Sequence, residues 1–389
     1  MRKPVRWMLL AGIAAIACAL ATGCGKVKEG PDGPCQPESD VAFCQRLIKD
    51  CNAVTAFDNC ESSRTVNCGT CASGAECGGG GEDNVCWLDT WTQLNPSSLP
   101  PARQYPQMAY DSAREVVVLF GGAESDFQAN LLDDTWEWDG QNWSAKQPTQ
   151  RPPARWGGSM FFDEARGEIV LFGGSLNGVG GADGVGAGDT WVWNGTTWTQ
   201  RSPATSPPAR KGAAITYDSE RDVIVLFGGI DDQGVRFGDL WEWNGTTWTQ
   251  RVTPVTPPAR FLAAMAFDAT RNVSVLHGGH DGDDRSDTWE WNGASWSDRT
   301  STAQGPDING HAMVFDTQRS LVVLFGGFDS PAGPVAETWE YDGSVWQEQA
   351  PAERPLPRTG PGVAYDPARG VTLVFGGGAQ GPLGDLWTR

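Results

Sequence analysis

The segment GDTWVWNGTTWTQ, residues 188–200, returns almost unchanged as GDLWEWNGTTWTQ at residues 238–250. Each copy carries three tryptophans, and the chain of 389 residues contains 19. A large aromatic residue that recurs at one position of a repeat is typical of a hydrophobic core built from similar units. The repeat therefore has to be delimited before any single residue is interpreted.

Six tryptophans mark equivalent positions along the chain: Trp91, Trp143, Trp198, Trp248, Trp296 and Trp346. Each is followed 20 residues later by an aspartate, and nine residues after that by Phe or His before a Gly-Gly pair. A second tryptophan comes next, after a gap that varies from 12 to 19 residues. Each repeat therefore contains four strand-like pieces of constant length and one variable loop. Four short strands at a period near 50 predict a propeller blade.

A hydrophobic strand ending in Gly-Gly, spaced aromatic residues and segments such as PPAR resemble the kelch repeat over residues 87–389. The resemblance implies an all-β, six-bladed kelch propeller and says little about function. The last repeat stops after its third strand, at GDLWTR, whereas an additional strand around Trp91 precedes the first repeat. We expect this N-terminal strand to complete the sixth blade and close the ring.

Each repeat has a turn of the form D-x-x-R, from Asp111 with Arg114 to Asp366 with Arg369. Aspartate can accept the amides of the turn, and arginine can pair with it. Asp-Gly or Asn-Gly pairs at 139, 194, 244, 292 and 342 indicate hairpins between the two outer strands. Because blade strands alternate in direction, these turns share one face of the propeller, the turn face. The variable loops share the opposite loop face, where we expect recognition to occur.

The N-terminal residues 1–23 combine basic Arg2, Lys3 and Arg6 with an apolar run, which is typical of a signal peptide. The run ends in LATGC and resembles the lipobox of bacterial lipoproteins. This resemblance implies lipidation of Cys24, a tether over residues 24–34, and anchoring to the bacterial outer membrane. A cleaved secretory signal and a secreted protein are the alternative.

Eight further cysteines lie in a module over residues 35–86, and none follows it. In an oxidising compartment they predict four disulfides whose pairing the sequence leaves open, formed among Cys35, Cys44, Cys51, Cys60, Cys68, Cys71, Cys77 and Cys86. A zinc site would need a matching second C-x-x-C pair, which the module lacks. The module is similar to cysteine-rich modules of exported myxobacterial proteins, so the whole chain resembles their exported kelch proteins.

The formal net charge is −19, and no basic stripe is present to hold a phosphate backbone. We therefore expect no nucleic-acid partner. The acidity is typical of a solvated, non-adhesive surface, and we expect a monomer.

Five arginines begin the first strand of a repeat on the loop face, and Ile308 replaces the sixth: Arg103, Arg155, Arg210, Arg260 and Arg358. In kelch propellers this arginine can line the mouth of the central channel; alternatively, it hydrogen-bonds neighbouring loop carbonyls. The following position varies and includes Trp156, Lys211 and Phe261. Together the two positions could bind an acidic or carbohydrate group.

The three histidines, His277, His280 and His311, are weak candidates for a metal site, and we expect no cofactor. Galactose oxidase uses a kelch propeller, but its copper site needs a Tyr–Cys cross-link, and no cysteine lies in residues 87–389. Sialidase boxes are absent as well. The sequence favours a non-catalytic, surface-anchored protein that binds a protein or glycan through its loop face. A carbohydrate-active enzyme with loop carboxylates and a structural envelope component are the alternatives.

Overall fold

The computed structural model describes residues 29–30, 33–34, 39–47, 52–60, 62–69, 75–77, 86–88, 90–125, 130–176 and 186–389. The chain divides into two compact units, Met1–Gly69 and Thr70–Arg389, and each is described by itself. No helix among these residues is both long and apolar enough to span a membrane. Cys24 lies outside the described residues.

The first unit packs one helix against one hairpin. Helix α1 (Asp40–Leu47) covers β3 (Ala53–Phe57) and β4 (Ser63–Asn67), and a separate short hairpin pairs β1 (Glu29–Gly30) with β2 (Gly33–Pro34). Phe43, Val54 and Val66 form its small core. Ser39 caps the helix, since its Oγ accepts the Ala42 amide, and Asp40 pairs with Arg64 in the first turn.

A disulfide joins Cys44 of α1 to Cys68 after β4. Such a link supports a unit whose apolar core is small. Cys60 is disulfide-bonded as well. Cys35, Cys51 and Cys71 lie outside the described residues, so the rest of the predicted pairing stays a prediction.

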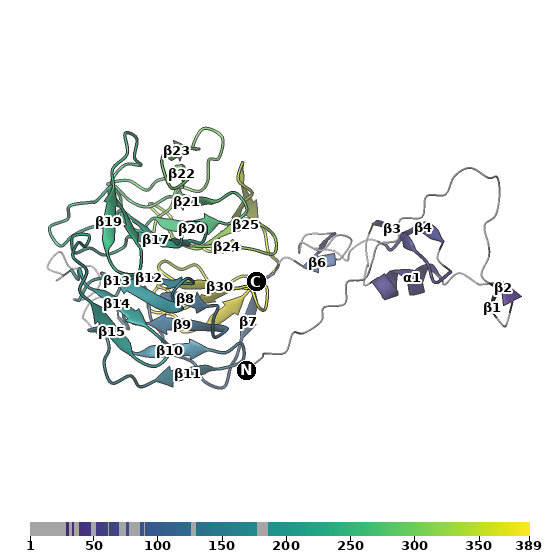
Figure 1. The fold of residues 1–389 in the computed structure, drawn as a ribbon, viewed down its shortest axis with the longest axis horizontal. Coiled ribbons are helices and arrows are strands. Elements are labelled where there is room, and N and C mark those ends of the chain that lie inside the picture. Colours follow the sequence, from purple (N-terminus) through teal and green to yellow (C-terminus); the bar gives the residue numbers. More distant parts are fainter. Residues whose placement is uncertain are drawn as a thin grey trace, which may run out of the picture. The chain divides into compact units, whose positions relative to one another are not determined.

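The second unit is a six-bladed β-propeller of four-stranded antiparallel sheets (Figure 1). We name the strands of a blade a to d from the axis outward. Blade 1 contains β8 (Gln107–Asp111), β9 (Val116–Phe120), β10 (Thr135–Trp138) and β11 (Trp143–Lys146). Blade 2 contains β12 (Ser159–Asp163), β13 (Glu168–Phe172), β14 (Thr190–Trp193) and β15 (Trp198–Arg201). Blade 3 contains β16 (Ala214–Asp218), β17 (Val223–Phe227), β18 (Leu240–Trp243) and β19 (Trp248–Arg251).

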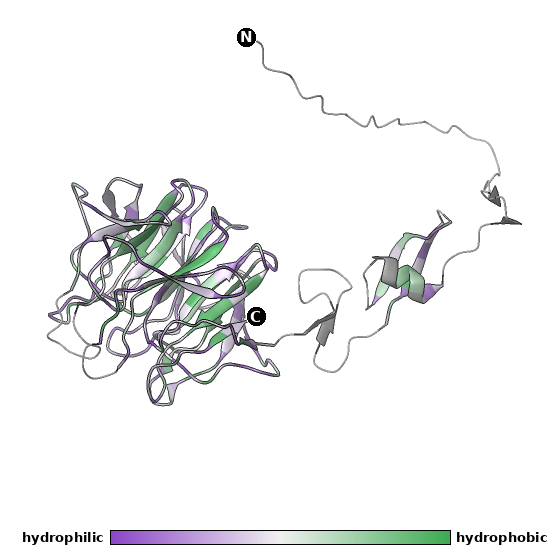
Figure 2. Ribbon diagram, turned by 90° about the horizontal axis from the view of Figure 1, so that it is seen from below, coloured by the Kyte–Doolittle hydropathy of each residue, from purple (hydrophilic) through white to green (hydrophobic). Residues whose placement is uncertain are grey.

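The remaining blades follow the same order. Blade 4 contains β20 (Ala264–Asp268), β21 (Val273–His277), β22 (Thr288–Trp291) and β23 (Trp296–Asp298). Blade 5 contains β24 (Ala312–Asp316), β25 (Leu321–Phe325), β28 (Thr338–Tyr341) and β29 (Trp346–Gln349), with the hairpin of β26 (Phe328–Asp329) and β27 (Gly333–Pro334) in its b–c loop. The hydrophobic residues concentrate in the strands and the hydrophilic ones in the connections (Figure 2).

Blade 6 is assembled from both ends of the propeller, as the sequence predicted. Its strands are β30 (Gly362–Asp366), β31 (Val371–Phe375), β32 (Leu386–Thr388) and the N-terminal β7 (Thr92–Leu94). Leu386 pairs with Leu94 and Thr388 with Thr92. Strand a of every blade contacts strand a of both neighbours, so the ring is closed. A further hairpin, β5 (Ala75–Cys77) with β6 (Cys86–Leu88), precedes β7.

The six marker tryptophans connect adjacent blades. Each is buried and packs against the last residue of strand b in the preceding blade, with ring centroids 4.8–5.7 Å apart: Trp198 on Phe120, Trp248 on Phe172, Trp296 on Phe227, Trp346 on His277, Trp91 on Phe325 and Trp143 on Phe375. In four interfaces the indole N–H also donates to a threonine of the preceding strand c, as from Trp248 to Thr190 at 3.0 Å. Where leucine stands instead, at Leu240 and Leu386, the facing indole N–H lacks a partner. The tryptophans are therefore core residues.

The turn face is fixed by repeated ion pairs. In all six D-x-x-R turns the aspartate accepts the amide of the arginine and binds its side chain. Five of the arginines also lie against the c–d turn of the following blade. At Gly245 (φ 93°) an added Cβ would overlap Arg166, so glycine is needed there for space as well as conformation.

Deleting residues 87–94 should lower the melting temperature far more than deleting residues 24–34. The first deletion removes β7 and Trp91, which exposes the edge of β32 and leaves Phe325 without its indole. Circular dichroism of both truncations gives the measurement. Equal melting temperatures would contradict the closed ring.

Candidate functional site

The five arginines at the start of strand a are buried inside the blades, with 0–1% of their surface exposed. Arg155 Nη1 and Nη2 donate to the two carboxylate oxygens of Asp189 at 2.6 and 2.9 Å. Its Nη1 also donates to the Gly173 carbonyl, and its Nε to the Pro153 carbonyl. The same arrangement joins Arg103 to Asp134, Arg210 to Asp239, Arg260 to Asp287 and Arg358 to Asp385. The structure favours the second alternative, in which these arginines bind loop groups.

The paired aspartates are held in their ionised form. Burial opposes ionisation of Asp189, but the hydrogen bonds and charge of Arg155 outweigh it and keep the pKa of this carboxyl below its usual range. Asp287 shows the same balance with Arg260. In blade 5 both partners differ, because Ile308 replaces the arginine and Glu337 the aspartate. These five arginines therefore stabilise the fold.

The residue after each arginine lies nearer the mouth of the channel. Trp156 is 7% exposed, and it lies between Tyr105 of blade 1, at 5.2 Å between ring centroids, and Lys211 of blade 3, whose Nζ is 5.1 Å from its ring centroid. Burial lowers the pKa of Lys211, and the charge of Asp232 opposes this shift. Phe261 is half-buried and packs edge-on against His280. Trp156 therefore supports its neighbours, while Lys211 and Phe261 reach solvent.

A closed ring of six backbone hydrogen bonds surrounds the axis at this mouth, and the sequence analysis missed it. Each N–H donates to the carbonyl of the preceding blade at 2.7–3.4 Å, through Tyr105, Gly157, Gly212, Leu262, Gly310 and Gly360. All six residues have φ between 51° and 61°. This left-handed conformation explains four glycines two residues after the arginine position. That spacing was the available signal, but Tyr105 and Leu262 interrupt it.

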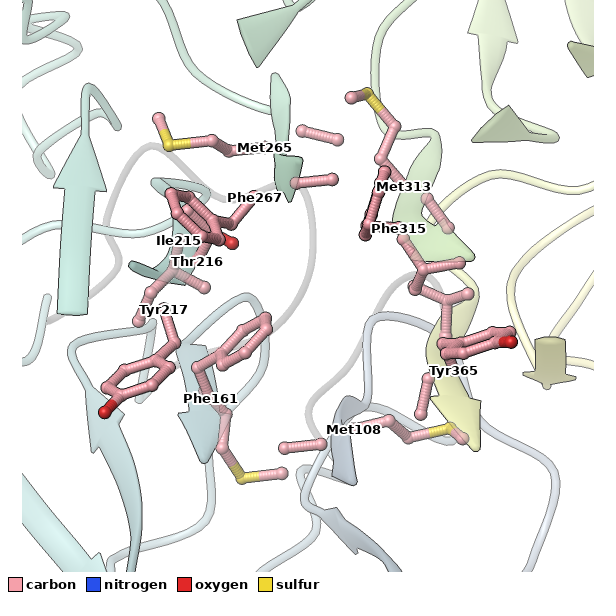
Figure 3. Close-up of a pocket in the computed structure, with 18 of the residues that line it drawn as sticks. Met108, Phe161, Ile215, Thr216, Tyr217, Met265, Phe267, Met313, Phe315 and Tyr365 are labelled. Carbon is pink, nitrogen blue, oxygen red and sulfur yellow. The ribbon is translucent and has the colours of Figure 1, made fainter. Parts of the chain in front are cut away.

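Next to this ring of hydrogen bonds, along the six inner strands, lies a cavity of about 390 Å³. Its walls come from strand a of all six blades and are mainly apolar, as Met108, Phe161, Met265 and Phe315 illustrate (Figure 3). The cavity volume lies in the range of small-molecule pockets. The fold therefore offers two places for a partner, the loop face and this axial cavity.

Two of the three histidines meet between blades 4 and 5. His277 occupies the position of the strand b phenylalanine, and its Nδ1 and Nε2 lie 3.0 Å from Thr288 Oγ1 and from the Pro306 carbonyl oxygen. His311 is buried 5.7 Å away between ring centroids, and neither of its nitrogens has a hydrogen-bond partner among the described residues. Burial lowers the pKa of His277 to about 4 and that of His311 well below its usual value. Both rings are therefore neutral near pH 7.

The third histidine belongs to an acidic part of the loop face. His280 Nδ1 is 2.9 Å from Asp284 Oδ1, and Asp284 also accepts from Asn309 Nδ2 and from the Ser330 amide. Partial burial and the charges of Asp284 and Asp329 raise the pKa of the nearby Asp307. Within the described ranges, no set of three or more His, Cys, Asp or Glu side chains is arranged to hold a metal ion.

No protein-family model matches the chain, and no curated protein is detectably similar to it. The fold is therefore assigned from the strand topology alone. It is a β-propeller, a fold commonly used as a scaffold for protein interactions.

Replacing Arg155 by alanine should lower the free energy of unfolding by about 3–5 kcal/mol, because Asp189 would keep its charge in a partly buried place with the Trp191 indole but no cation beside it. The matched control is Arg151→Ala, which breaks an ion pair with Asp133. The side chains of Arg151 and Asp133 are 47% and 40% exposed. We expect a change below about 1 kcal/mol for the control. Urea denaturation measures both, and similar losses would contradict the structural role of the arginine ring.

The free energy of unfolding should fall as the pH is lowered from about 6.5 to about 4. In this window the unfolded chain protonates His277 while the folded protein keeps it neutral, at a cost of up to ~3 kcal/mol. His277→Phe should reduce the dependence, and the buried His311 should account for what remains; the other five blades already place phenylalanine at this position. His280→Gln, at a half-exposed histidine, should leave the slope unchanged. Identical slopes for the natural chain and His277→Phe, in denaturation at several pH values, would disprove this assignment.

Proposed function

We propose that this protein is a kelch-type interaction propeller that binds a protein ligand through its loop face. The observation that carries the proposal is the distribution of exposed apolar side chains. Among the described residues, seven large hydrophobic side chains are exposed, and five of them belong to loop-face connections: Leu99, Val235, Val252, Val255 and Leu356. Exposed apolar groups rimmed by polar residues are typical of protein interfaces.

The axial part of the loop face supports the same proposal. Phe261 and Lys211 reach solvent beside the rigid ring of backbone hydrogen bonds, and rigid positioning lowers the entropy lost on binding. The described loops of blades 3 and 4 also carry Asp231, Asp281 and Asp283. We infer a partner surface that combines apolar and basic groups, and an affinity that decreases as salt concentration rises.

The turn face supports the proposal by contrast. Its arginines are engaged by aspartates within each blade, and its connections have one length in every repeat. Recognition through surfaces that differ between blades therefore belongs to the opposite side.

We further propose that the protein acts at a cell surface, with residues 24–34 as tether and a lipid on Cys24 as anchor. This part rests on the LATGC segment and on the cysteine-rich module. Cys24→Ala would then move the protein from the membrane fraction to a soluble one.

Photocrosslinking with two matched valines tests the loop-face proposal. A photoreactive phenylalanine replaces either Val255, which is 55% exposed on the loop face, or Val345, which is 41% exposed in a c–d turn. In intact cells, irradiation should give a discrete protein adduct from position 255 and none from position 345. Adding Lys211→Ala or Phe261→Ala should reduce the adduct at least threefold.

Three results would overturn the proposal. Adducts of equal yield from both positions would show unspecific contact, and their absence at 255 together with an adduct at 345 would place the interface on the turn face. An adduct that mass spectrometry identifies as a glycan would replace the protein ligand by a carbohydrate.

A further inference from the structure

The axial cavity is independent of the loop-face proposal, because the two lie at different levels of the molecule. At one end its lining begins with the residues directly after the ring of backbone hydrogen bonds, such as Pro106, His311 and Pro361. These three are buried, whereas the equivalent Gly158, Ala213 and Ala263 are partly exposed. At the other end the lining residues follow the turn aspartates, and all of them are exposed: Glu164, Ser219, Ala269, Thr317 and Pro367. The cavity is therefore most accessible from the turn face.

The cavity has the dimensions of an extended chain. It follows strands of five residues, which at about 3.4 Å per residue gives a length of about 17 Å. A volume of about 390 Å³ extends along this length between mainly apolar walls. The methionines among its walls have flexible, polarisable side chains that adapt to a linear apolar molecule. The length and the lining of the cavity therefore favour an alkyl chain.

One residue shows that the width of the cavity depends on the third position of strand a. This position holds a small or medium side chain in five blades, as with Ala109, Ala266 and Val314, but Phe161 in blade 2. The Phe161 ring points toward the open centre (Figure 3). Val314 is partly exposed to the same space, so a second phenylalanine there would narrow it further.

The exposed end carries negative charge. Among the described residues that line the cavity, Glu164 is the only acidic one, and none is an arginine or a lysine. Partial burial and the charge of Asp222 raise the pKa of Glu164, so a nearby cation would favour its ionised form. Aromatic residues at the fourth position of strand a, including Tyr110 and Tyr365, line the same end. Such rings also attract cations.

We propose that the axial cavity binds one linear alkyl chain with a cationic head group, the chain lying along the six inner strands and the head beside Glu164. The net charge of −19 attracts such a cation toward the protein, whereas the carboxylate of a fatty acid would be repelled at this rim.

Calorimetric titration of the full-length protein with three probes of equal chain length tests the proposal. The probes are dodecyltrimethylammonium, 1-dodecanol and dodecanoate, each below its micellar concentration, with near-ultraviolet circular dichroism to verify folding. We expect the ammonium to bind about tenfold more tightly than the alcohol and the carboxylate to bind most weakly. Tetramethylammonium, which lacks the chain, should not bind.

Three variants distinguish binding of the alkyl chain from binding of the cationic head group. Val314→Phe should weaken binding of the ammonium probe and of the alcohol at least tenfold, while its melting temperature shows whether the fold is kept. Phe161→Ala widens the same space and should retain binding of both. Glu164→Gln should make the two probes bind equally. Phe261→Ala, on the loop face, should change neither.

The proposal fails if Phe161→Ala and the natural chain both show no binding of the ammonium probe, since one of them presents an open cavity in either case. It also fails if tetramethylammonium binds as well as the long-chain probe, or if dodecanoate binds as tightly. These outcomes leave the loop-face crosslinking unaffected, so the two proposals can be judged separately.

Discussion

The packing of each marker tryptophan on the preceding blade is the interaction on which the propeller depends. All six interfaces use it, with ring centroids within 5.7 Å, and five of the six partner rings are phenylalanines. An indole on the outer strand of one blade thus buries the inner strands of another. Neighbouring blades share their apolar cores, so closing the ring buries surface that an open end would expose. Trp91 on the N-terminal strand therefore belongs to the fold as much as any internal repeat does.

Electrostatic pairing adds a second set of constraints and explains why the repeated charged residues are unavailable for recognition. Arg155 and its equivalents bind an aspartate and two carbonyls. The turn arginines are similarly engaged, and five of them lie against a glycine of the next blade. The residue type varies between blades at the positions of Lys211 and Phe261 and in the loops around them. Function is therefore expected where the pattern varies.

The interface between blades 4 and 5 departs most from the pattern, and its changes occur together. In blade 5, Ile308 and Glu337 replace the arginine–aspartate pair of the other blades. In blade 4, His277 replaces the phenylalanine that ends strand b elsewhere. His277 keeps the contact with Trp346 and adds hydrogen bonds to Thr288 and Pro306. His277 and His311 are buried and neutral. Because protonation would place a desolvated charge between the blades, we expect this interface to be the most sensitive to acid.

Much of the fold follows from the sequence because its determinants recur at constant spacing. The marker tryptophans, the D-x-x-R turns and the Gly-Gly pairs predict six blades, and the strand missing at the C-terminus predicts the closure by β7. These signals are local, since each depends on strands and tight turns of fixed length. The partners of the arginines were decided only by the tertiary structure: Arg155 meets Asp189 34 positions away, but Arg260 meets Asp287 after 27. The intervening loop varies, so no constant spacing reveals the pair. The ring of backbone hydrogen bonds and the axial cavity likewise need six strands side by side, because each blade contributes only one sixth of either.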